Sequence, residues 1–320
     1  MTIQISFGMK KNIYDDYIIG ISFGFHDSAV ALIQNGKVLN AVEEERFTGI
    51  KHDNSFPINS INWILKNNKI VGKQISAVCY YENPILKKDR DWKSYWKYFW
   101  KNPFKFPKKT NPLEHFDYIF PNAKVFIGNH HLSHLAYSYF TSDFDESAIL
   151  SVDGVGEWDT TVLASGKDNI IKRHSEVVYP HSLGLLYSTI TAFLGFKPNE
   201  GEYKVMGLAP YGTHLFHHKK FDELIKETED GFELNMEYFS YHYSDKIMFN
   251  TKLSKLFGIP NRLSEEPIND IHKNISAALQ YTYEKHFFRL LNKLYEKTKS
   301  KNLCLSGGCA YNGTANGKIQ

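Results

Sequence analysis

The sequence is short of cysteine. Only three cysteines occur in 320 residues, at Cys79, Cys304 and Cys309. So few, and an odd number, exclude the disulfide framework that holds many small secreted domains together. Cys304 and Cys309 have four residues between them, which is not a common zinc spacing. We therefore expect a reduced, intracellular chain in which these two cysteines are small core residues.

The chain also lacks long apolar runs and an excess of charge of one sign. No apolar run reaches about 18 residues, so no transmembrane helix is expected. The first residues, MTIQISFGMKKNIYDD, place their lysines after the short apolar part, unlike a signal peptide. The 38 basic and 35 acidic residues leave a net charge of +3, which does not favour a nucleic-acid or membrane partner. The sequence predicts a cytoplasmic protein.

Apolar residues, in contrast, are plentiful. The chain is 42% hydrophobic and 15% aromatic, which supplies a sizeable core and excludes global disorder. A length of 320 residues allows two domains or one large two-lobed domain.

Two parts of the chain share one plan. In the first part, strands are predicted at 17–23, 29–33 and 38–42, with a polar turn after the first strand and an Asn35-Gly36 hairpin signal after the second. In the second, an apolar strand from Ala148 ends in the Gly-rich turn 153–156, and a strand at 160–164, a tight turn at 166–169 and a third strand follow. Each part then leads into a helical pattern, at 58–67 and at 183–194.

A unit of this kind that occurs twice predicts two similar α/β lobes, whose turns present backbone N–H groups to phosphates. This is the plan of the actin, Hsp70 and sugar-kinase superfamily, a duplicated ribonuclease-H-like fold. We predict an N-terminal extension at 1–16, a first lobe at 17–146 and a second lobe at 147–320.

Three histidines cluster in GNHHLSHLAYSYF, residues 128–140. The helical period predicts that His130 and His134 project together, one turn apart and within reach of one ligand, with His131 on the flank. Asn129 is the expected N-cap. The opposite, core-facing stripe comprises Leu132, Leu135, Ala136 and Tyr139. The spacing alone leaves two readings open, a metal site and a solvated polar face.

Two further stretches are informative. NLCLSGGCAYNG predicts a strand at 302–305, after which Gly307 and Gly308 let a ligand approach the backbone or simply form a turn. Residues 86–109 mix aromatic and basic side chains. We interpret them as an amphipathic surface helix, ended by Pro103 and Pro107, in preference to a nucleic-acid or membrane patch.

The motifs GISFGFHDSAVAL, AVEEERF, NHHLSHLAYSYF, LSVDGVGEW, NEGEYKVMGLAPYG and LSGGCAYNGTANGKI together resemble a known family. It is the O-carbamoyltransferases of nodulation-factor and antibiotic biosynthesis, which include the tobramycin and cephamycin enzymes. The resemblance runs from residue 17 to residue 320 and is loose at 87–124 and 214–269. The fold that it implies is also that of the tRNA threonylcarbamoyl transferases.

The resemblance implies a two-stage reaction. A separate C-terminal domain converts carbamoyl phosphate and ATP into carbamoyl-adenylate. The actin-like domain then binds that adenylate beside a metal, Fe(II) or another divalent ion, and passes the carbamoyl group to a hydroxyl of a small-molecule acceptor.

The resemblance also assigns residues. It makes His130, His134 and Asp153 metal ligands, and two imidazoles with one carboxylate suit Fe(II). It places His26 near the carbamoyl group, with Asp27 beside it and Lys51 as an active-site lysine. Its cofactor-binding residues are Gly154, Glu200, Lys204, Gly307, Gly308 and Asn312.

The chemistry asks for the same residue types. Carbamoyl transfer builds negative charge on the carbonyl oxygen and the leaving phosphate, which a metal and Lys51 can stabilise. The acceptor hydroxyl needs a base, and His26 is best matched to neutral pH. The structural alternatives are a turn-capping His26, a solvated Lys51 and an Asp153 that bonds only its own turn.

The sequence departs from the family at its end. The family's second lobe continues past residue 320 with a further aspartate for the metal, and the adenylate-forming domain follows. We expect that this chain needs that domain, in cis or in trans, and does not make carbamoyl-adenylate alone. The alternatives are a tRNA threonylcarbamoyl transferase, a sugar or acetate kinase and a non-catalytic nucleotide-binding remnant. A homodimer is left open.

Overall fold

The computed structural model describes residues 2–4, 16–97, 100, 112–244 and 246–319. Most of the predicted N-terminal extension, and Pro103 and Pro107, lie outside the described residues. The chain forms two compact units, each built around one sheet. The first-sheet unit comprises Ser6–Lys88 and Lys108–Ser133, and the second-sheet unit comprises Met1–Ile5, Asp89–Pro107 and His134–Gln320.

The first-sheet unit contains five strands in the order β4-β3-β2-β5-β6. The strands β2 (Tyr17–Ser22), β3 (Ala29–Gln34) and β4 (Lys37–Glu43) form an antiparallel meander. On the other side of β2, the strands β5 (Ile75–Tyr80) and β6 (Lys124–Ile127) run parallel to it. The three predicted strands are therefore confirmed, and no bound differs by more than one residue.

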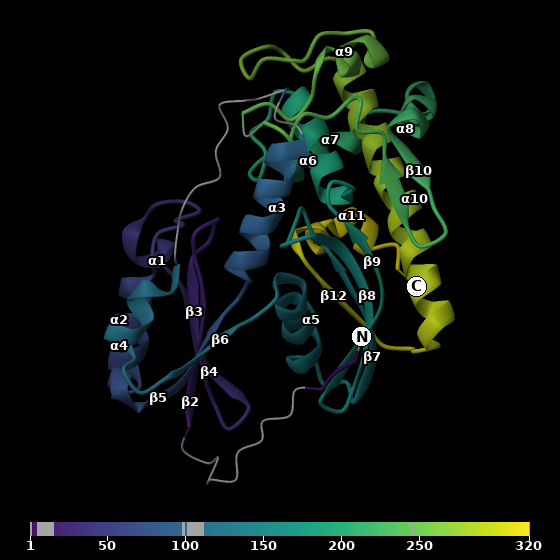
Figure 1. The fold of residues 1–320 in the computed structure, drawn as a ribbon. Helices are drawn as coiled ribbons and strands as arrows, with labels where there is room; N and C mark the ends of the chain where they lie inside the picture. The colour runs from purple at the N-terminus through teal and green to yellow at the C-terminus, as the bar shows by residue number, and fades with distance from the viewer. Residues whose placement is uncertain (1, 5–15, 98–99, 101–111, 245, 320) are drawn as a thin grey trace. The chain divides into compact units, whose positions relative to one another are not determined.

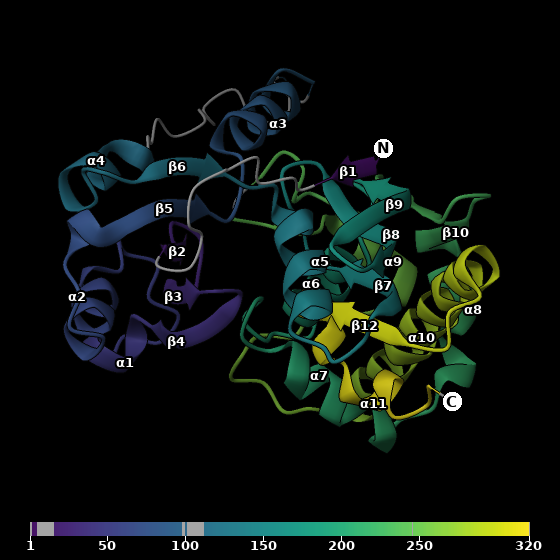
Figure 2. The same cartoon turned by 90° about the horizontal axis from the view of Figure 1, so that it is seen from below.

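Helices cover one side of this sheet (Figure 1 and Figure 2). Helix α2 (Ile58–Asn67) has the predicted bounds, and its Ile61 and Ile64, one turn apart, are buried in the same core as Ile19 and Ile21 of β2. Burial of each such side chain contributes about 1.5–3 kcal/mol. The short elements α1 (Glu45–Thr48), η2 (Gly72–Gln74), η4 (Pro112–His115) and α4 (Phe116–Ile119) complete the unit.

The start of α2 is held by a buried carboxylate. Glu44, which is 1% exposed, accepts hydrogen bonds from the backbone N–H groups of Asn59 and Ser60 at 3.1 and 2.8 Å. The side chains of the same two residues donate to it at 2.7 and 2.6 Å. Glu44 thus satisfies N–H groups that no helical carbonyl can reach, and its charge suits the positive end of the helix dipole.

The second-sheet unit repeats the strand order. Its sheet runs β1-β9-β8-β7-β12. The strands β7 (Glu146–Val152), β8 (Asp159–Lys167) and β9 (Ile170–Val178) are antiparallel, and β12 (Leu303–Ser306) lies parallel to β7. The short strand β1 (Thr2–Gln4) adds to the far edge of β9.

The orders β4-β3-β2-β5 and β9-β8-β7-β12 match strand for strand and direction for direction. This match confirms the predicted α/β class with a duplicated ribonuclease-H-like plan. Among the described residues, the second sheet has no strand beside β12 that corresponds to β6. The domain bounds at 146 and 147 stay a prediction, while the contacts assign residues 89–107 and 134–146 to the second-sheet unit.

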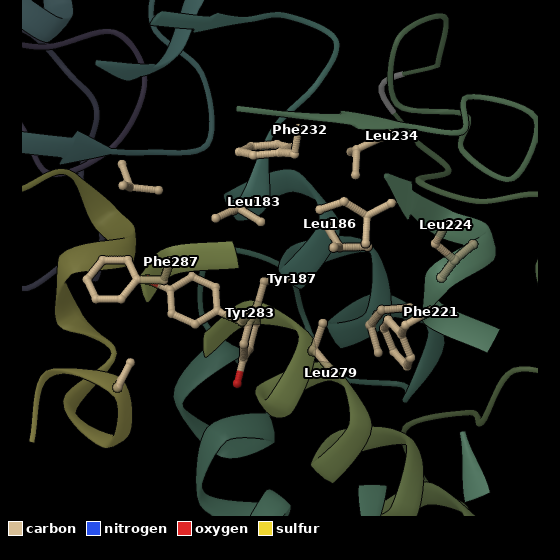
Figure 3. Packing of buried hydrophobic residues seen from close by; sticks show 14 of the residues in the cluster. Leu183, Leu186, Tyr187, Phe221, Leu224, Phe232, Leu234, Leu279, Tyr283 and Phe287 are labelled. Atoms are coloured by element: carbon tan, nitrogen blue, oxygen red, sulfur yellow. The ribbon is translucent and has the colours of Figure 1, made fainter. Parts of the chain in front are cut away.

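The second-sheet unit packs around α6 (Leu183–Phe193) and the long helix α10 (Asp270–Thr298). In Figure 3, Tyr187 of α6 meets Tyr283 of α10 edge to face at 5.8 Å, and Phe287 stacks on Tyr283 at 5.5 Å. Leu183 and Leu186 extend the same core. The remaining elements are α3 (Pro84–Lys97), α5 (His130–Phe140), α7 (Glu202–Leu208), η5 (Ala209–Tyr211), η6 (His214–Phe216), α8 (His218–Leu224), β10 (Ile225–Glu227), β11 (Phe232–Leu234), α9 (Thr251–Phe257), η7 (Gly308–Tyr311) and α11 (Gly313–Asn316).

One predicted turn is shorter than expected. The turn predicted at 166–169 is wrong for Gly166 and Lys167, because β8 continues to Lys167. A Cβ atom at Gly166 would lie 2.6 Å from the ring of Tyr139, so the glycine is there for close packing and not for a turn. Within the described part of the chain, no helix is both long enough and apolar enough to cross a membrane.

Candidate active site

Two turns meet at the carboxyl ends of β7 and β12. The strands are parallel neighbours, with Ser306 paired to Ser151, so the residues after each strand lie side by side. The N–H of Gly308 donates to a carboxylate oxygen of Asp153 at 3.0 Å. Gly307 has φ +87°, and a Cβ atom there would lie 2.3 Å from the carbonyl oxygen of Val152. Only glycine fits this contact, and Asp153, Gly307 and Gly308 are therefore brought together.

The start of α6 packs against the same turn. The Ser182 hydroxyl, fully buried, lies 2.7 Å from the carbonyl oxygen of Gly154 and accepts the N–H of Leu185 at 3.0 Å. A Cβ atom on Gly184 would lie 2.7 Å from the Asp153 carbonyl oxygen. The turn that carries Asp153 and Gly154 is thus held between β12 and the N-terminus of a helix, a place that favours bound anions.

Asp153 also meets a histidine of α5. Nε2 of His134 lies 3.4 Å from a carboxylate oxygen of Asp153, and both side chains are partly buried. His130 precedes His134 by one turn of the same continuous helix and belongs to the same set of possible metal ligands. The division between the two units falls inside α5, between Ser133 and His134. Two imidazoles and a carboxylate are a donor set that fits a divalent ion such as Fe(II).

Helix α5 confirms one prediction and corrects another. Asn129 caps it, since its side-chain oxygen accepts the N–H of Leu132 at 3.1 Å. The prediction that His131 lies on the flank is wrong, because His131 is fully buried in line with Leu135 and Tyr139. Burial thus follows the row 131, 135 and 139, whereas the predicted core-facing stripe was Leu132, Leu135, Ala136 and Tyr139.

His26 and Asp27 lie in the turn between β2 and β3 of the first-sheet unit. Nδ1 of His26 lies 2.8 Å from one carboxylate oxygen of Asp27, and Nδ1 of His52 lies 2.8 Å from the other. Burial acts to raise the pKa of Asp27, but the hydrogen bonds from His52 and His26, together with the electrostatic attraction of the same two side chains, outweigh it and hold that pKa below its usual value. Asp27 is therefore a charged link between two imidazoles.

The sequence had singled out Lys51, and the structure adds its neighbour. Lys51 is exposed, whereas His52 both reaches Asp27 and uses its backbone N–H to bond a carboxylate oxygen of Glu45 at 3.0 Å. The only signal for His52 was its place beside Lys51 in IKHD. Its partner lies 25 residues away, which no local pattern reveals.

Asn312, Glu200 and Lys204, which were predicted to bind the cofactor, contact other side chains of the protein. Asn312 is buried, exchanges hydrogen bonds at 3.0 Å with Gln280 and caps α11. Glu200 forms an ion pair with Lys197, and Lys204 is exposed beside Tyr203. Their roles toward a nucleotide stay predictions.

The cysteines behave as predicted. Cys304 is buried, and Cys309 packs against the core of the second-sheet unit. Burial, and then the nearby carboxylates of Asp153 and Glu202, raise the pKa of the Cys309 thiol far above its usual value. A thiol held protonated in this way is a poor metal ligand.

Comparison with known proteins identifies the relatives of this chain. The model of the family described as Carbamoyltransferase N-terminus matches residues 17–320. The chain is 41% identical over 321 residues to an uncharacterized protein of Synechocystis, covering 95% of this chain and 52% of the relative. It is 32% identical over 300 residues to the nodulation protein NolNO of Sinorhizobium fredii, covering 92% and 42%. The chain thus spans about half the length of these curated relatives.

Solved structures give weaker similarities. HypF of T. kodakarensis matches with a TM-score of 0.47 and 12% identity, over 95% of this chain and 43% of HypF. Component A of the (R)-2-hydroxyglutaryl-CoA dehydratase of Acidaminococcus fermentans matches with a TM-score of 0.46 and 15% identity, over 94% and 86%. Both scores are low, and the fold described above rests on strand order alone.

Proposed function

Because this chain belongs to the carbamoyltransferase N-terminus family, we propose that it performs the transfer step of a two-stage carbamoyltransferase. In this proposal, a carbamoyl group passes from carbamoyl-adenylate, formed from carbamoyl phosphate and ATP, to a hydroxyl of a small molecule. The observation that carries the proposal is the pair of turns at the ends of β7 and β12, where the Asp153 carboxylate contacts His134 and accepts the N–H of Gly308.

The second-sheet unit would hold the donor. His134 and Asp153, with His130 one turn before on α5, would bind a divalent ion, which supplies Lewis-acid stabilisation of phosphate and carbonyl oxygens. Gly307 and Gly308 carry no side chains, so the β12 turn could approach an adenylate closely through its backbone. The helix N-terminus at Ser182 adds a positive dipole beside the same turn.

The first-sheet unit would activate the acceptor. The acceptor oxygen forms a bond to the carbamoyl carbon while the bond from that carbon to the phosphate oxygen breaks and AMP leaves. The hydroxyl proton passes to Nε2 of His26, whose other nitrogen is bonded to Asp27. Lys51 would stabilise the charge that develops on the carbonyl oxygen.

In this proposal, a further domain, in cis or in trans, makes the carbamoyl-adenylate. The chain spans about half the length of the curated relatives that it matches, which leaves room in those proteins for such a domain. The use of ATP and carbamoyl phosphate fits the predicted cytoplasmic location.

The proposed transfer step is tested directly by adding the carbamoyl donor to the purified chain. Freshly prepared carbamoyl-adenylate is incubated with the chain and a panel of hydroxylated small molecules, and products are followed by mass spectrometry. Carbamoylated product is expected, and it is expected to disappear in His26→Ala. Transfer to tRNA alone, or phosphorylation of a sugar by ATP without any carbamoyl donor, would replace the proposal with one of the alternative enzymes.

A further inference from the structure

The turn that carries His26 is hydrogen-bonded through its backbone to the loop that follows α1. The N–H of Gly24 donates to the carbonyl oxygen of Asn54 at 3.0 Å, and the N–H of Ser28 donates to that of Asp53 at 2.7 Å. These bonds bracket the turn on both sides of His26. The loop at 52–54 therefore sets the position of the turn, although the two lie more than twenty residues apart in the sequence.

Between these two hydrogen bonds, two residues with a left-handed backbone conformation, Asp27 and His52, are joined by a side-chain hydrogen bond. Asp27 has φ +51° and His52 has φ +57°, a left-handed conformation that side-chain-bearing residues rarely adopt. Their side chains form a hydrogen bond of 2.8 Å, from Nδ1 of His52 to the Asp27 carboxylate. Such strain at both ends of one hydrogen bond persists only where the surroundings enforce it, and it gathers at functional sites.

The bond geometry assigns the proton positions. An ionised carboxylate only accepts hydrogen bonds, and the pKa of Asp27 is held low, so both histidines present N–H at Nδ1. The remaining nitrogen of each neutral ring, Nε2, then carries a lone pair.

The two imidazoles are not equivalent, however. Nε2 of His52 is buried and has no hydrogen-bond partner among the described residues, so a proton there would lack an acceptor. The side chain of His26 is 46% exposed, against 31% for that of His52. His52 is thus suited to donate through Nδ1 alone, and the more exposed His26 is suited to exchange a proton at Nε2.

We infer that His52 is a positioning residue that fixes the Asp27 carboxylate, which in turn holds His26 with Nδ1 protonated and Nε2 free for the acceptor hydroxyl. The part played by His26 rests on the proposed function. The placement of the protons on the two imidazoles does not, and it can be measured on the chain itself without substrate.

Two substitutions separate the hydrogen bond from the backbone. His52→Asn keeps a donor near the place of Nδ1 and tolerates the left-handed conformation. His52→Gly accepts the same φ without strain but removes the donor. The chain is labelled with ¹⁵N-histidine, and His26→Gln identifies the His26 signals.

The expected spectra differ. The parent chain and His52→Asn show His26 as the Nδ1–H tautomer, whereas His52→Gly shows His26 with substantial Nε2–H. In the transfer assay, kcat falls by about 10- to 100-fold in His52→Gly, as for other outer-shell partners, with KM little changed, and His52→Asn recovers most of it.

Other outcomes would overturn the inference. It fails if His26 is the Nε2–H tautomer in the parent chain, or if His52→Gly leaves the His26 tautomer unchanged. Glu45 also lies within 4.8 Å of ligand atoms of Asp27 and His52, so a His52 signal that shifts when EDTA is added would assign the cluster to a cation instead. An absence of carbamoyl transfer with the predicted tautomers would refute the proposed function alone.

Discussion

Nε2 of His134 lies 3.4 Å from the carboxylate of Asp153, although the two residues are 19 positions apart in the sequence. The contact joins helix α5 to the turn after strand β7, and the N–H of Gly308, in the turn after β12, donates to the same carboxylate. His134 of α5 and the turns after β7 and β12 thus meet at one carboxylate, and the expectations for the metal and for the β12 turn depend on this arrangement.

The first concerns metal. We expect His134→Ala to lose the divalent ion that the parent chain retains after purification in the presence of Fe(II), because it removes one of three donors. Elemental analysis of the purified chains measures this. His218→Ala, on α8, is the matched control and is expected to retain the metal. Equal metal content in the parent chain and His134→Ala would show that His134 is not a ligand.

The second concerns the β12 turn. Gly307→Ala places a Cβ atom 2.3 Å from the Val152 carbonyl oxygen in a backbone at φ +87°. We expect a loss of about 1–3 kcal/mol in the free energy of unfolding, measured by urea denaturation. Gly313→Ala, where a Cβ atom would meet no atom within 4 Å, is expected to be neutral or slightly stabilising. Equal stability of the two variants would contradict the close approach.

The third concerns the buried carboxylate at the start of α2. Glu44→Ala leaves the N–H groups of Asn59 and Ser60 without their acceptor, and we expect the free energy of unfolding to fall by about 1–3 kcal/mol. The adjacent Glu43 pairs with the exposed Arg46, so Glu43→Ala is expected to cost less than about 0.5 kcal/mol. Chemical denaturation of both variants makes the comparison, and an equal loss would argue against the capping role.

The fourth concerns pH. Burial lowers the pKa of His286 from 6.5 to about 4. The unfolded chain therefore takes up this proton first as the pH falls, and stability is lost from about pH 6.5 until the folded histidine protonates near pH 4. The loss amounts to about 3 kcal/mol over this range, at about 1.4 kcal/mol for each pKa unit.

The His286→Gln variant lacks this titrating group. Urea unfolding of the parent and the variant at pH 7 and pH 4.5 should show a smaller loss of stability for the variant. If both chains lose stability equally between these two pH values, the protonation of His286 is not the cause.

The sequence predicted the parts of the fold whose causes are local. Alternating and buried apolar runs marked β2, β3 and β4, and helix α2 was placed at its observed bounds because its apolar residues repeat with the helical period. The recurrence of the same unit predicted the duplicated strand order. Asn129 was identified as a cap because its side chain acts within three residues.

Contacts between distant segments were beyond such patterns. Periodicity put His131 on the flank of α5, but the surface that α5 covers decides its burial, and that surface is made elsewhere in the chain. The family motif indicated Lys51 but not His52. The hydrogen bond from His52 to Asp27 forms only because backbone hydrogen bonds hold the turn at 24–28 against the loop at 52–54.

The sequence alone therefore determined which segments become strands and helices, which histidines and carboxylates follow strand ends, and which two histidines lie one turn apart on a helix. These properties depend on steric preferences and burial over a few neighbouring residues. The tertiary structure decided the partners: Asp153 with His134 and Gly308, and Asp27 with both His26 and His52. A hydrogen bond needs two atoms about 3 Å apart, and only the packing of the sheets and their turns brings these atoms together.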